Sequence, residues 1–138
     1  MNMHAIKDES VPCVTALVVD DSKMIRVTAK KILLKAGYEV VLATDGLDAL
    51  SKVVEYQPDL IIMDIMMPEI DGYETCTLIK QHREYKRIPV IMLSGNQEKS
   101  ESAQVEAAGF DLCLAKPFKA DGLLDAIDSV LEKAKYFK

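Results

Sequence analysis

Acidic residues directly follow two of the most apolar stretches of the sequence. Asp20 and Asp21 come after LVV, and Asp64 comes after LIIM. A carboxylate at the end of a buried segment can bind a hard cation or act as a nucleophile. Acidic pairs such as Asp20 and Asp21 are also typical of a turn and a helix cap. Asp64 has no such capping role, because apolar residues stand on both sides of it, so it is the stronger functional candidate.

Two further polar residues end apolar runs in the second half of the chain. Ser94 ends PVIMLS, and Lys116 ends DLCLAK before Pro117. Each is ordinary alone, because SGN is common turn sequence and a lysine before proline suits a loop. Together with the aspartates they form a pattern, since every one stands at the same end of its run. That pattern favours a shared site over unrelated coincidences.

The apolar runs themselves predict a parallel β-sheet. They are rich in Val, Ile and Leu and mostly apolar throughout, which is typical of strands covered on both faces. Helical patterns separate them, so the chain alternates between strand and helix. The expected strands are residues 15–20, 39–43, 59–64, 89–94 and 111–116.

Five helices are expected between and after these strands. Ser22, Asp45 and Asp71 are residue types that cap the starts of the first three. The fourth helix, roughly 97–108, has few apolar residues to bury, and the fifth runs from about 120 to 135. In the second helix the residues expected to point inward are Leu47, Leu50, Val53 and Val54.

These elements predict an α/β fold, a doubly wound five-stranded parallel sheet of order 2-1-3-4-5 with five helices on both faces. Ligands of such sheets bind beyond the carboxyl ends of the strands, where the strand order switches direction. Strands 1 and 3 are neighbours in this order, so Asp20, Asp21 and Asp64 should converge there. Three close carboxylates repel one another unless a cation lies among them.

Magnesium is the cation that this set of residues favours. Mg²⁺ takes oxygen ligands and keeps positions open for water and a phosphate oxygen, whereas the sequence offers no His and Cys set for zinc. Lys116 and Ser94 would then face a bound phosphoryl group, the first as a charge and the second as a hydrogen-bond donor. The constellation predicts a phosphoryl site in which an aspartate is the acceptor.

Composition narrows the class of protein. The 138 residues carry 22 acidic and 17 basic side chains, with a net charge of -5 and no Lys/Arg run that would follow a nucleic acid. Cys13, Cys76 and Cys113 are widely spaced and contain no CxxC. Neither a disulfide framework nor a zinc site is expected, and no apolar run is long enough to span a membrane. We therefore expect a cytoplasmic protein that binds neither nucleic acid nor membranes.

The length suits a single domain with one core. Residues 1–13 are interpreted as a flexible N-terminal extension, because they contain no apolar stretch that could act as a signal peptide. Residues 14–135 would form the domain, and residues 136–138 a C-terminal tail. Because the chain ends soon after KPF, no output domain is expected.

The motifs resemble those of the receiver domain of two-component response regulators. VVDDS, IIMDIMMPEIDG, PVIMLSG and AKPF occur in the family's order and at its usual intervals, over roughly residues 14–134. The resemblance implies a flavodoxin-like fold and a phosphorelay role, in which a histidine kinase donates a phosphoryl group to Asp64. The stretch DIMMPEIDGYETCTLIK further resembles regulators from chemotaxis-like systems that control type IV pili and twitching motility.

The family's site residues carry over one by one. Ser94 and Lys116 would contact the phosphoryl oxygens, and the Lys116–Pro117 bond is expected to be cis. Gly72 matches the family's glycine at the start of the third helix. Asp21 would be the more direct of the two acidic metal ligands. The implied magnesium ligands are Asp20, Asp21, Asp64 and the backbone carbonyl of Met66.

Cys113 departs from the family's pattern. Three residues before the lysine, the family commonly has an aromatic ring that swings inward on phosphorylation, and a small thiol has little to expose or hide. Two alternatives remain: the response runs mainly through the loop after Ser94, or Phe110 takes part of the role. Met66 and Asn96 stand where the family tunes hydrolysis of the acyl phosphate. Since Met66 cannot orient a water, we expect an intermediate or long-lived phosphoryl state.

Together these observations favour a single-domain response regulator that signals through phosphorylation-dependent protein contacts and is not an enzyme beyond its own phosphotransfer and dephosphorylation. The expected partners are a histidine kinase and a downstream protein on the face of the fourth helix, fifth strand and fifth helix. The protein would be a monomer or a phosphorylation-dependent dimer.

Several alternatives to this interpretation remain open. The chain could be a phosphorylation-independent receiver scaffold, which Cys113 keeps open, or a receiver cut from a larger regulator. An aspartyl-phosphate phosphatase of the haloacid-dehalogenase type would need a second aspartate where Met66 stands. A flavin-binding module would need a hydroxyl-rich phosphate loop in place of the acidic DDSKM.

Overall fold

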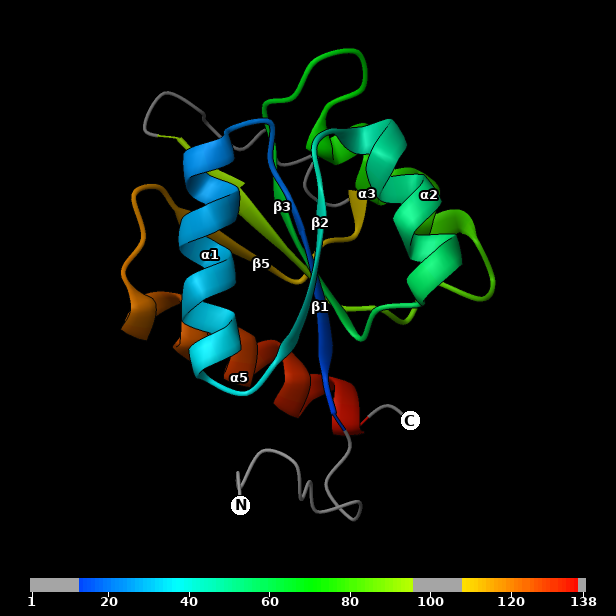
Figure 1. Cartoon of the computed structure of the whole chain (residues 1–138). Coiled ribbons are helices and arrows are strands. Elements are labelled where there is room, and N and C mark those ends of the chain that lie inside the picture. The colour runs from blue at the N-terminus through cyan, green and yellow to red at the C-terminus, as the bar shows by residue number, and fades with distance from the viewer. Residues whose placement is uncertain (1–12, 96–107, 137–138) are drawn as a thin grey trace.

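The protein is described by a computed structural model, which covers residues 13–95 and 108–136. Five parallel strands form one sheet in the order β2-β1-β3-β4-β5 (Figure 1). The predicted order is confirmed, and each strand begins and ends within one residue of its expected range. The strands are β1 (Thr15–Val19), β2 (Glu39–Ala43), β3 (Leu60–Asp64), β4 (Val90–Ser94) and β5 (Leu112–Ala115).

Four helices lie in the described residues. They are α1 (Lys23–Lys35), α2 (Gly46–Tyr56), α3 (Gly72–Gln81) and α5 (Ala120–Tyr136). The remaining expected helix, at about 97–108, falls almost entirely on residues 96–107 and so lies outside the described residues. Four of the five predicted helices are therefore confirmed within the described residues.

The predicted caps explain where three of these helices begin. The side chains of Ser22, Asp45 and Asp71 each accept a hydrogen bond from a backbone N–H of the following turn. Asp71 forms a reciprocal capping box with Glu74, which fixes the first turn of α3. At the other end of α1, Gly37 has a positive φ of 97°, a conformation that favours glycine.

Alternate residues of the central strands point to opposite faces of the sheet. Ala16 and Val18 of β1 pack with α1 and α5, whereas Leu17 and Val19 pack with α2 and α3. In Figure 1 the two helix layers lie on either side of the sheet, α1 and α5 together and α2 and α3 together. The result is two apolar cores that bury β1 and β3 from both faces.

The inward face of α2 differs from the predicted one. Leu47 and Val54 are 53% and 60% exposed, so their predicted inward orientation was wrong. The buried residues are Gly46, Ala49 and Val53. Small side chains let α2 approach its neighbours closely, since a Cβ on Gly46 would overlap Thr75 of α3. The prediction from hydrophobicity placed Leu47 and Val54 inward, whereas the close packing of α2 buries the small residues Gly46 and Ala49.

The predicted extension and tail lie largely outside the described residues, because residues 1–12 and 137–138 are not covered. Within the described residues, no helix combines the length and hydropathy that a membrane span requires.

Candidate functional site

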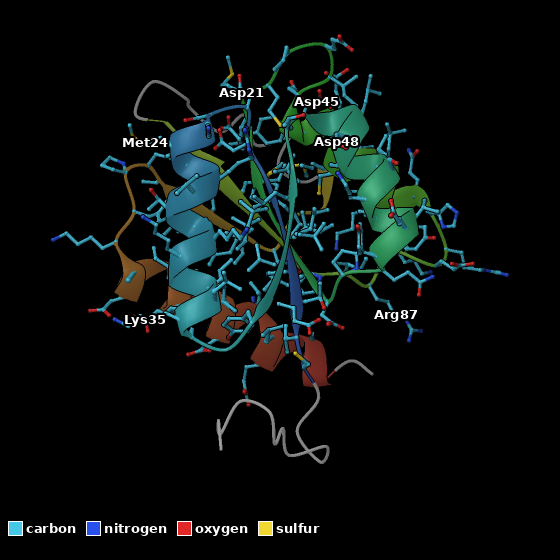
Figure 2. All side chains as sticks on the ribbon, in the orientation of Figure 1. Asp21, Met24, Lys35, Asp45, Asp48 and Arg87 are labelled. Carbon is cyan, nitrogen blue, oxygen red and sulfur yellow. The ribbon has the colours of Figure 1, made fainter. Side chains whose placement is uncertain are left out.

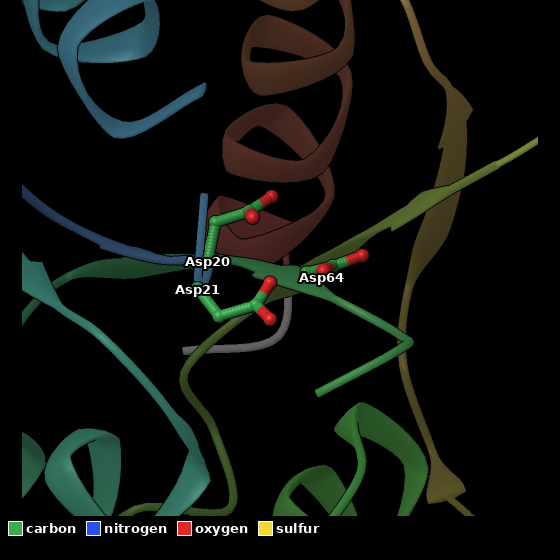
Figure 3. A group of neighbouring side chains, drawn as sticks. All are labelled: Asp20, Asp21 and Asp64. Carbon is green, nitrogen blue, oxygen red and sulfur yellow. The ribbon is translucent and has the colours of Figure 1, made fainter. Parts of the chain in front are cut away.

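The ends of β1 and β3 bring three carboxylates together. Asp20 and Asp21 follow β1, and Asp64 is the last residue of β3. Each offers an oxygen, and these oxygens lie within 4.8 Å of one another. Figure 3 shows the three side chains at this edge of the sheet. Asp20 and Asp64 are 0% and 3% exposed, whereas Asp21 faces solvent.

Lys116, which follows β5, supplies the cation that the structure places among these acids. Its Nζ lies 2.9 Å from Oδ1 of Asp64 and 3.0 Å from Oδ2 of Asp20. Burial alone would lower the pKa of Lys116, but the contacts with Asp64 and Asp20 outweigh burial and raise it. The pKa of Asp64 is raised, mainly by burial and also by the charge of Asp20, although Lys116 opposes this. One lysine cannot neutralise three carboxylates.

The turn between β1 and α1 is held by two hydrogen bonds to Asp20. The backbone N–H of Ser22 donates to Oδ1 of Asp20 at 2.8 Å. Arg26, on the first turn of α1, donates from Nη1 to the backbone carbonyl of Asp20 at 2.7 Å. The role of Arg26 was not predicted from the sequence, although an arginine about one helical turn after an acidic pair is a pattern that could have indicated it.

Gly72 fixes the backbone on the other side of the site. Its N–H donates to the carbonyl of Ile65 at 2.7 Å. A Cβ at this position would overlap the carbonyl oxygen of Asp64 and lie 2.8 Å from Cα of Ile65. Only glycine allows α3 to begin this close to the end of β3. The backbone N–H of Met66 also bonds to the Asp64 carboxylate.

The donor set of this site fits a hard divalent cation. Oδ2 of Asp20 is buried, and among the described residues no donor reaches it at a hydrogen-bonding angle, although Lys116 lies 3.0 Å away. A buried carboxylate oxygen without a hydrogen bond is costly unless a cation compensates it. All three side chains offer oxygen, which suits Mg²⁺ and not the softer transition metals.

The remaining predicted residues lie around this centre or outside the described chain. Ser94 ends β4 beside Ala115, and its carbonyl accepts from the backbone N–H of Lys116 at 2.7 Å. The Lys116–Pro117 bond, expected to be cis, is cis. The side chain of Met66 is 62% exposed. Asn96 lies outside the described residues.

The two residues that bear on the predicted switch, Cys113 and Phe110, differ in burial. Cys113 lies on β5 opposite Met92 and is exposed. Phe110 is partly buried in the core beneath α2 and α3, with its ring 6.0 Å from that of Tyr73.

Comparison with known proteins assigns these features to one family. The sequence model of one protein family, the response regulator receiver domain, matches residues 16–128. Protein PilG of Pseudomonas aeruginosa is 48% identical over 111 residues, which cover 80% of this chain and 82% of that protein. Chemotaxis protein CheY of Bacillus subtilis is 42% identical over 116 residues, covering 83% and 95%.

The fold is shared with solved structures of the same family. The structure of chemotaxis protein CheY4 of Vibrio cholerae matches with a TM-score of 0.81 at 35% identity, covering 86% of this chain and 99% of that one. Against other relatives, the mycobacterial response regulators named MprA, the chain spans about half of their length.

Proposed function

The chain belongs to the response regulator receiver family, and on this premise we propose that Asp64 accepts a phosphoryl group and that Asp20, Asp21 and Asp64 bind Mg²⁺. Receiver domains are phosphoacceptor signalling domains and not classical enzymes. The observation that carries the proposal is the position of Asp64. Its carboxylate ends a buried central strand, lies 2.9 Å from Lys116, and shares its surroundings with two further carboxylates.

The proposed reaction transfers a phosphoryl group from a phosphohistidine to Asp64. A carboxylate oxygen of Asp64 forms the new P–O bond while the P–N bond breaks, and the departing imidazole takes up a proton. Negative charge builds on the phosphoryl oxygens during this transfer. Lys116 is close enough to Asp64 to stabilise that charge, and the Ser94 hydroxyl would donate a hydrogen bond from the neighbouring strand.

The metal is proposed to be held by Asp20 and Asp21 with Asp64 and the Met66 carbonyl. When bound, Mg²⁺ would supply positive charge to the phosphoryl oxygens. Asp20 is positioned for this by Ser22 and Arg26, which fix its carboxylate and its carbonyl. Asp21 is the exposed member of the set, so it is the ligand that an entering cation meets first.

The proposed partners are a histidine kinase as phosphodonor and a downstream protein that distinguishes the two phosphorylation states. Two methionines that follow the acidic residues closely in the sequence are exposed, Met24 at 76% and Met66 at 62%, and Asp21 is exposed as well. Exposed apolar side chains around a reacting carboxylate suit contact with a protein donor. Figure 2 labels Met24 and Asp21 at this edge of the molecule.

Control of motility is the proposed context. The sequence similarity to Protein PilG and to chemotaxis protein CheY supports this context. The output face predicted from the family comprises the fourth helix, β5 and α5, and of these the described residues include β5 and α5.

The proposal is tested by intact mass of the purified chain after incubation with Mg²⁺ and a small phosphodonor such as acetyl phosphate. We expect one phosphoryl adduct, absent in Asp64→Asn and absent when the metal is chelated. Asp48→Asn is the matched control, because Asp48 accepts a hydrogen bond from the backbone of Thr44 and pairs with Lys52, whereas Lys116 pairs with Asp20 and Asp64. It should accept the phosphoryl group as the wild type does.

A histidine-kinase donor provides the second arm. An adduct that persists in Asp64→Asn would move the acceptor to another residue. No adduct with either donor would overturn the phosphoacceptor proposal and leave a receiver scaffold. Decay of the adduct within seconds at neutral pH would contradict the long-lived state expected from Met66.

A further inference from the structure

Arg26 lies on the first turn of α1, where a positive charge does not stabilise the helix. The N–H groups at the start of a helix carry positive partial charge, so acidic side chains are favourable there and basic ones are not. This turn of α1 contains no acidic residue and carries Lys23 as well as Arg26. A contact outside the helix therefore explains the arginine better than helix stability does.

The contact that Arg26 makes lies in the β1–α1 turn. Its Nη1 donates to the backbone carbonyl of Asp20 at 2.7 Å, and its backbone N–H donates to the carbonyl of Ser22 at 3.1 Å. The second bond is the ordinary first bond of a helix, whereas the first one depends on the guanidinium. Arg26 thus bonds to the chain on both sides of Asp21.

Both peptide groups that flank the Cα of Asp21 are held by hydrogen bonds. The peptide group before it contains the Asp20 carbonyl, which accepts from Arg26. The peptide group after it contains the Ser22 N–H, which donates to Oδ1 of Asp20 at 2.8 Å. Because a peptide group is planar, holding one atom of each restricts φ and ψ of Asp21 and therefore the direction of its side chain.

The side chain of Asp21 has no contact of its own that would fix it. It is exposed, and its carboxylate forms no hydrogen bond or ion pair with another described residue. Its ligand oxygen nevertheless lies within 4.8 Å of those of Asp20 and Asp64 (Figure 3). An exposed carboxylate is free to change rotamer, so its position near the other two depends on the backbone that carries it.

We propose that Arg26 is a positioning residue for the magnesium site, because it holds the exposed ligand Asp21 in place through the Asp20 carbonyl. This inference rests on the proposed function, in which Asp21 binds Mg²⁺. The guanidinium has two opposing effects on that site: its charge repels an entering cation, and its hydrogen bond orients a ligand. Arg26 is partly exposed and takes part in none of the ion pairs of the described residues. Solvent therefore screens the repulsion, and orientation outweighs it.

Titration of the ¹⁵N-labelled full chain with MgCl₂ at constant ionic strength, followed by amide NMR shifts, tests this proposal. Arg26→Met should raise the dissociation constant for Mg²⁺ by about tenfold, as expected for a residue that orients a metal ligand. Arg26→Lys keeps the charge and a donor, so it should recover part of the affinity. Urea midpoints establish that each variant is folded.

Lys23→Met is the matched control, because it removes a positive charge from an exposed position on the same turn and leaves the bond between Arg26 and Asp20 in place. Its dissociation constant should fall or stay within about twofold of the wild-type value, since an exposed charge is largely screened. An Arg26→Met chain that binds Mg²⁺ as tightly as the wild type, or more tightly, would overturn the proposal.

The Mg²⁺ dependence of phosphorylation by acetyl phosphate gives a second readout. In Arg26→Met the Mg²⁺ concentration for half-maximal rate should rise by the same factor of about tenfold, while the rate at saturating Mg²⁺ stays within about twofold of the wild type. A lower saturating rate with an unchanged half-maximal concentration would contradict a role in positioning the metal ligand.

Hydrogen exchange of the Ser22 amide without metal separates this inference from the proposed function. If Arg26 holds the turn, this amide should exchange about fivefold faster in Arg26→Met than in the wild type or in Lys23→Met. Unchanged exchange would show that Arg26 does not hold the backbone around Asp21. A wild type whose amide signals do not respond to Mg²⁺ would instead reject the magnesium site of the proposed function, and this inference with it.

Discussion

The two halves of the site are built on different parts of the sheet. Asp20 and Asp64 belong to β1 and β3, which have a paired strand on each side and a helix layer on each face. Lys116 follows β5, an edge strand that pairs with β4 alone. All five residues of β3 are buried, whereas β5 alternates between partly buried and exposed residues.

Because of this difference, we call Asp20 and Asp64, with the ends of β1 and β3, the fixed half of the site. Lys116, with β5, is its adaptable half. A change at the end of β3 disturbs two strands and two cores, so the position of Asp64 is strongly determined. A change on β5 meets solvent on one side, and a side chain there can move at small cost in free energy. The proposed acceptor, Asp64, therefore lies where the fold is rigid, and we expect a phosphorylation-dependent change of shape to be easier at Lys116 and Cys113.

The largest expected effect is on the fixed half, in Gly72→Ala. The new Cβ would overlap backbone atoms of Asp64 and Ile65, which cannot move without shifting β3. We expect the free energy of unfolding to fall by about 2–3 kcal/mol in urea titrations, with slower phosphorylation.

Gly122→Ala is the matched control for this substitution. Nothing lies within 4 Å of a Cβ at Gly122, which is in the first turn of α5. The variant should be as stable as the wild type or more stable by about 0.5–1 kcal/mol. Equal urea midpoints for the two alanine variants would show that the end of β3 is not tightly constrained.

The second effect concerns Cys76, which packs in the core between the sheet and α2 and α3. Burial raises the pKa of its thiol from 9.0 to about 12. Above pH 9 the thiol ionises in the unfolded chain but stays neutral in the folded one. The free energy of unfolding should therefore fall with rising pH, by about 1.4 kcal/mol per unit, from this group alone.

The measurement is the difference between wild type and Cys76→Ala in urea midpoints at pH 8 and near pH 10. The alanine variant lacks this titration, so its stability should fall less steeply over that range. Cys113→Ala, which removes a cysteine from an exposed position, is the matched control. Parallel slopes for wild type and Cys76→Ala would contradict a buried neutral thiol.

A smaller effect is expected from Lys116→Met, which removes the cation of the adaptable half. The negative charges of Asp20 and Asp64 would then repel each other without a lysine between them. Because the side chain of Lys116 is 21% exposed, solvent partly screens its interaction with these carboxylates, which limits the loss of stability. Without metal we expect a loss of about 1–2 kcal/mol in stability, and added Mg²⁺ should recover part of it.

Lys52→Met tests whether this recovery is specific. Lys52 pairs with Asp48 at 3.1 Å on the surface of α2, and such helix pairs contribute about 0.2–0.5 kcal/mol. Lys52→Met keeps Lys116 beside the three aspartates, so added Mg²⁺ should stabilise it only as much as it stabilises the wild type, and less than it stabilises Lys116→Met. No response to Mg²⁺ in any of the three proteins would remove the evidence for a cation site among the three aspartates.

The smallest effect is expected from Cys113→Ala on the exposed side of β5. Its free energy of unfolding should change by less than about 0.5 kcal/mol, and the yield of phosphorylated protein should not change. Loss of phosphorylation-dependent partner binding in this variant would make Cys113 part of the switch instead of a passive position.

The sequence predicted the fold well, because strand runs and helix caps are local patterns. Ser22, Asp45 and Asp71 capped their helices as expected, and the strand bounds were close. It failed for Leu47 and Val54, whose exposure depends on how closely α2 approaches α3. It also missed Arg26, whose bond to Asp20 requires the path of the β1–α1 turn.

What the sequence determined by itself was the order of the elements and the residue types at the ends of the strands. These follow from periodicity and from motifs that lie within short stretches of the chain. Only the tertiary structure decided that Lys116 lies between Asp20 and Asp64, that Cys113 is exposed, and that α1 and α5 enclose a groove. The reason is physical: each of these facts depends on distances between residues far apart in the chain, which strand pairing and side-chain packing set together.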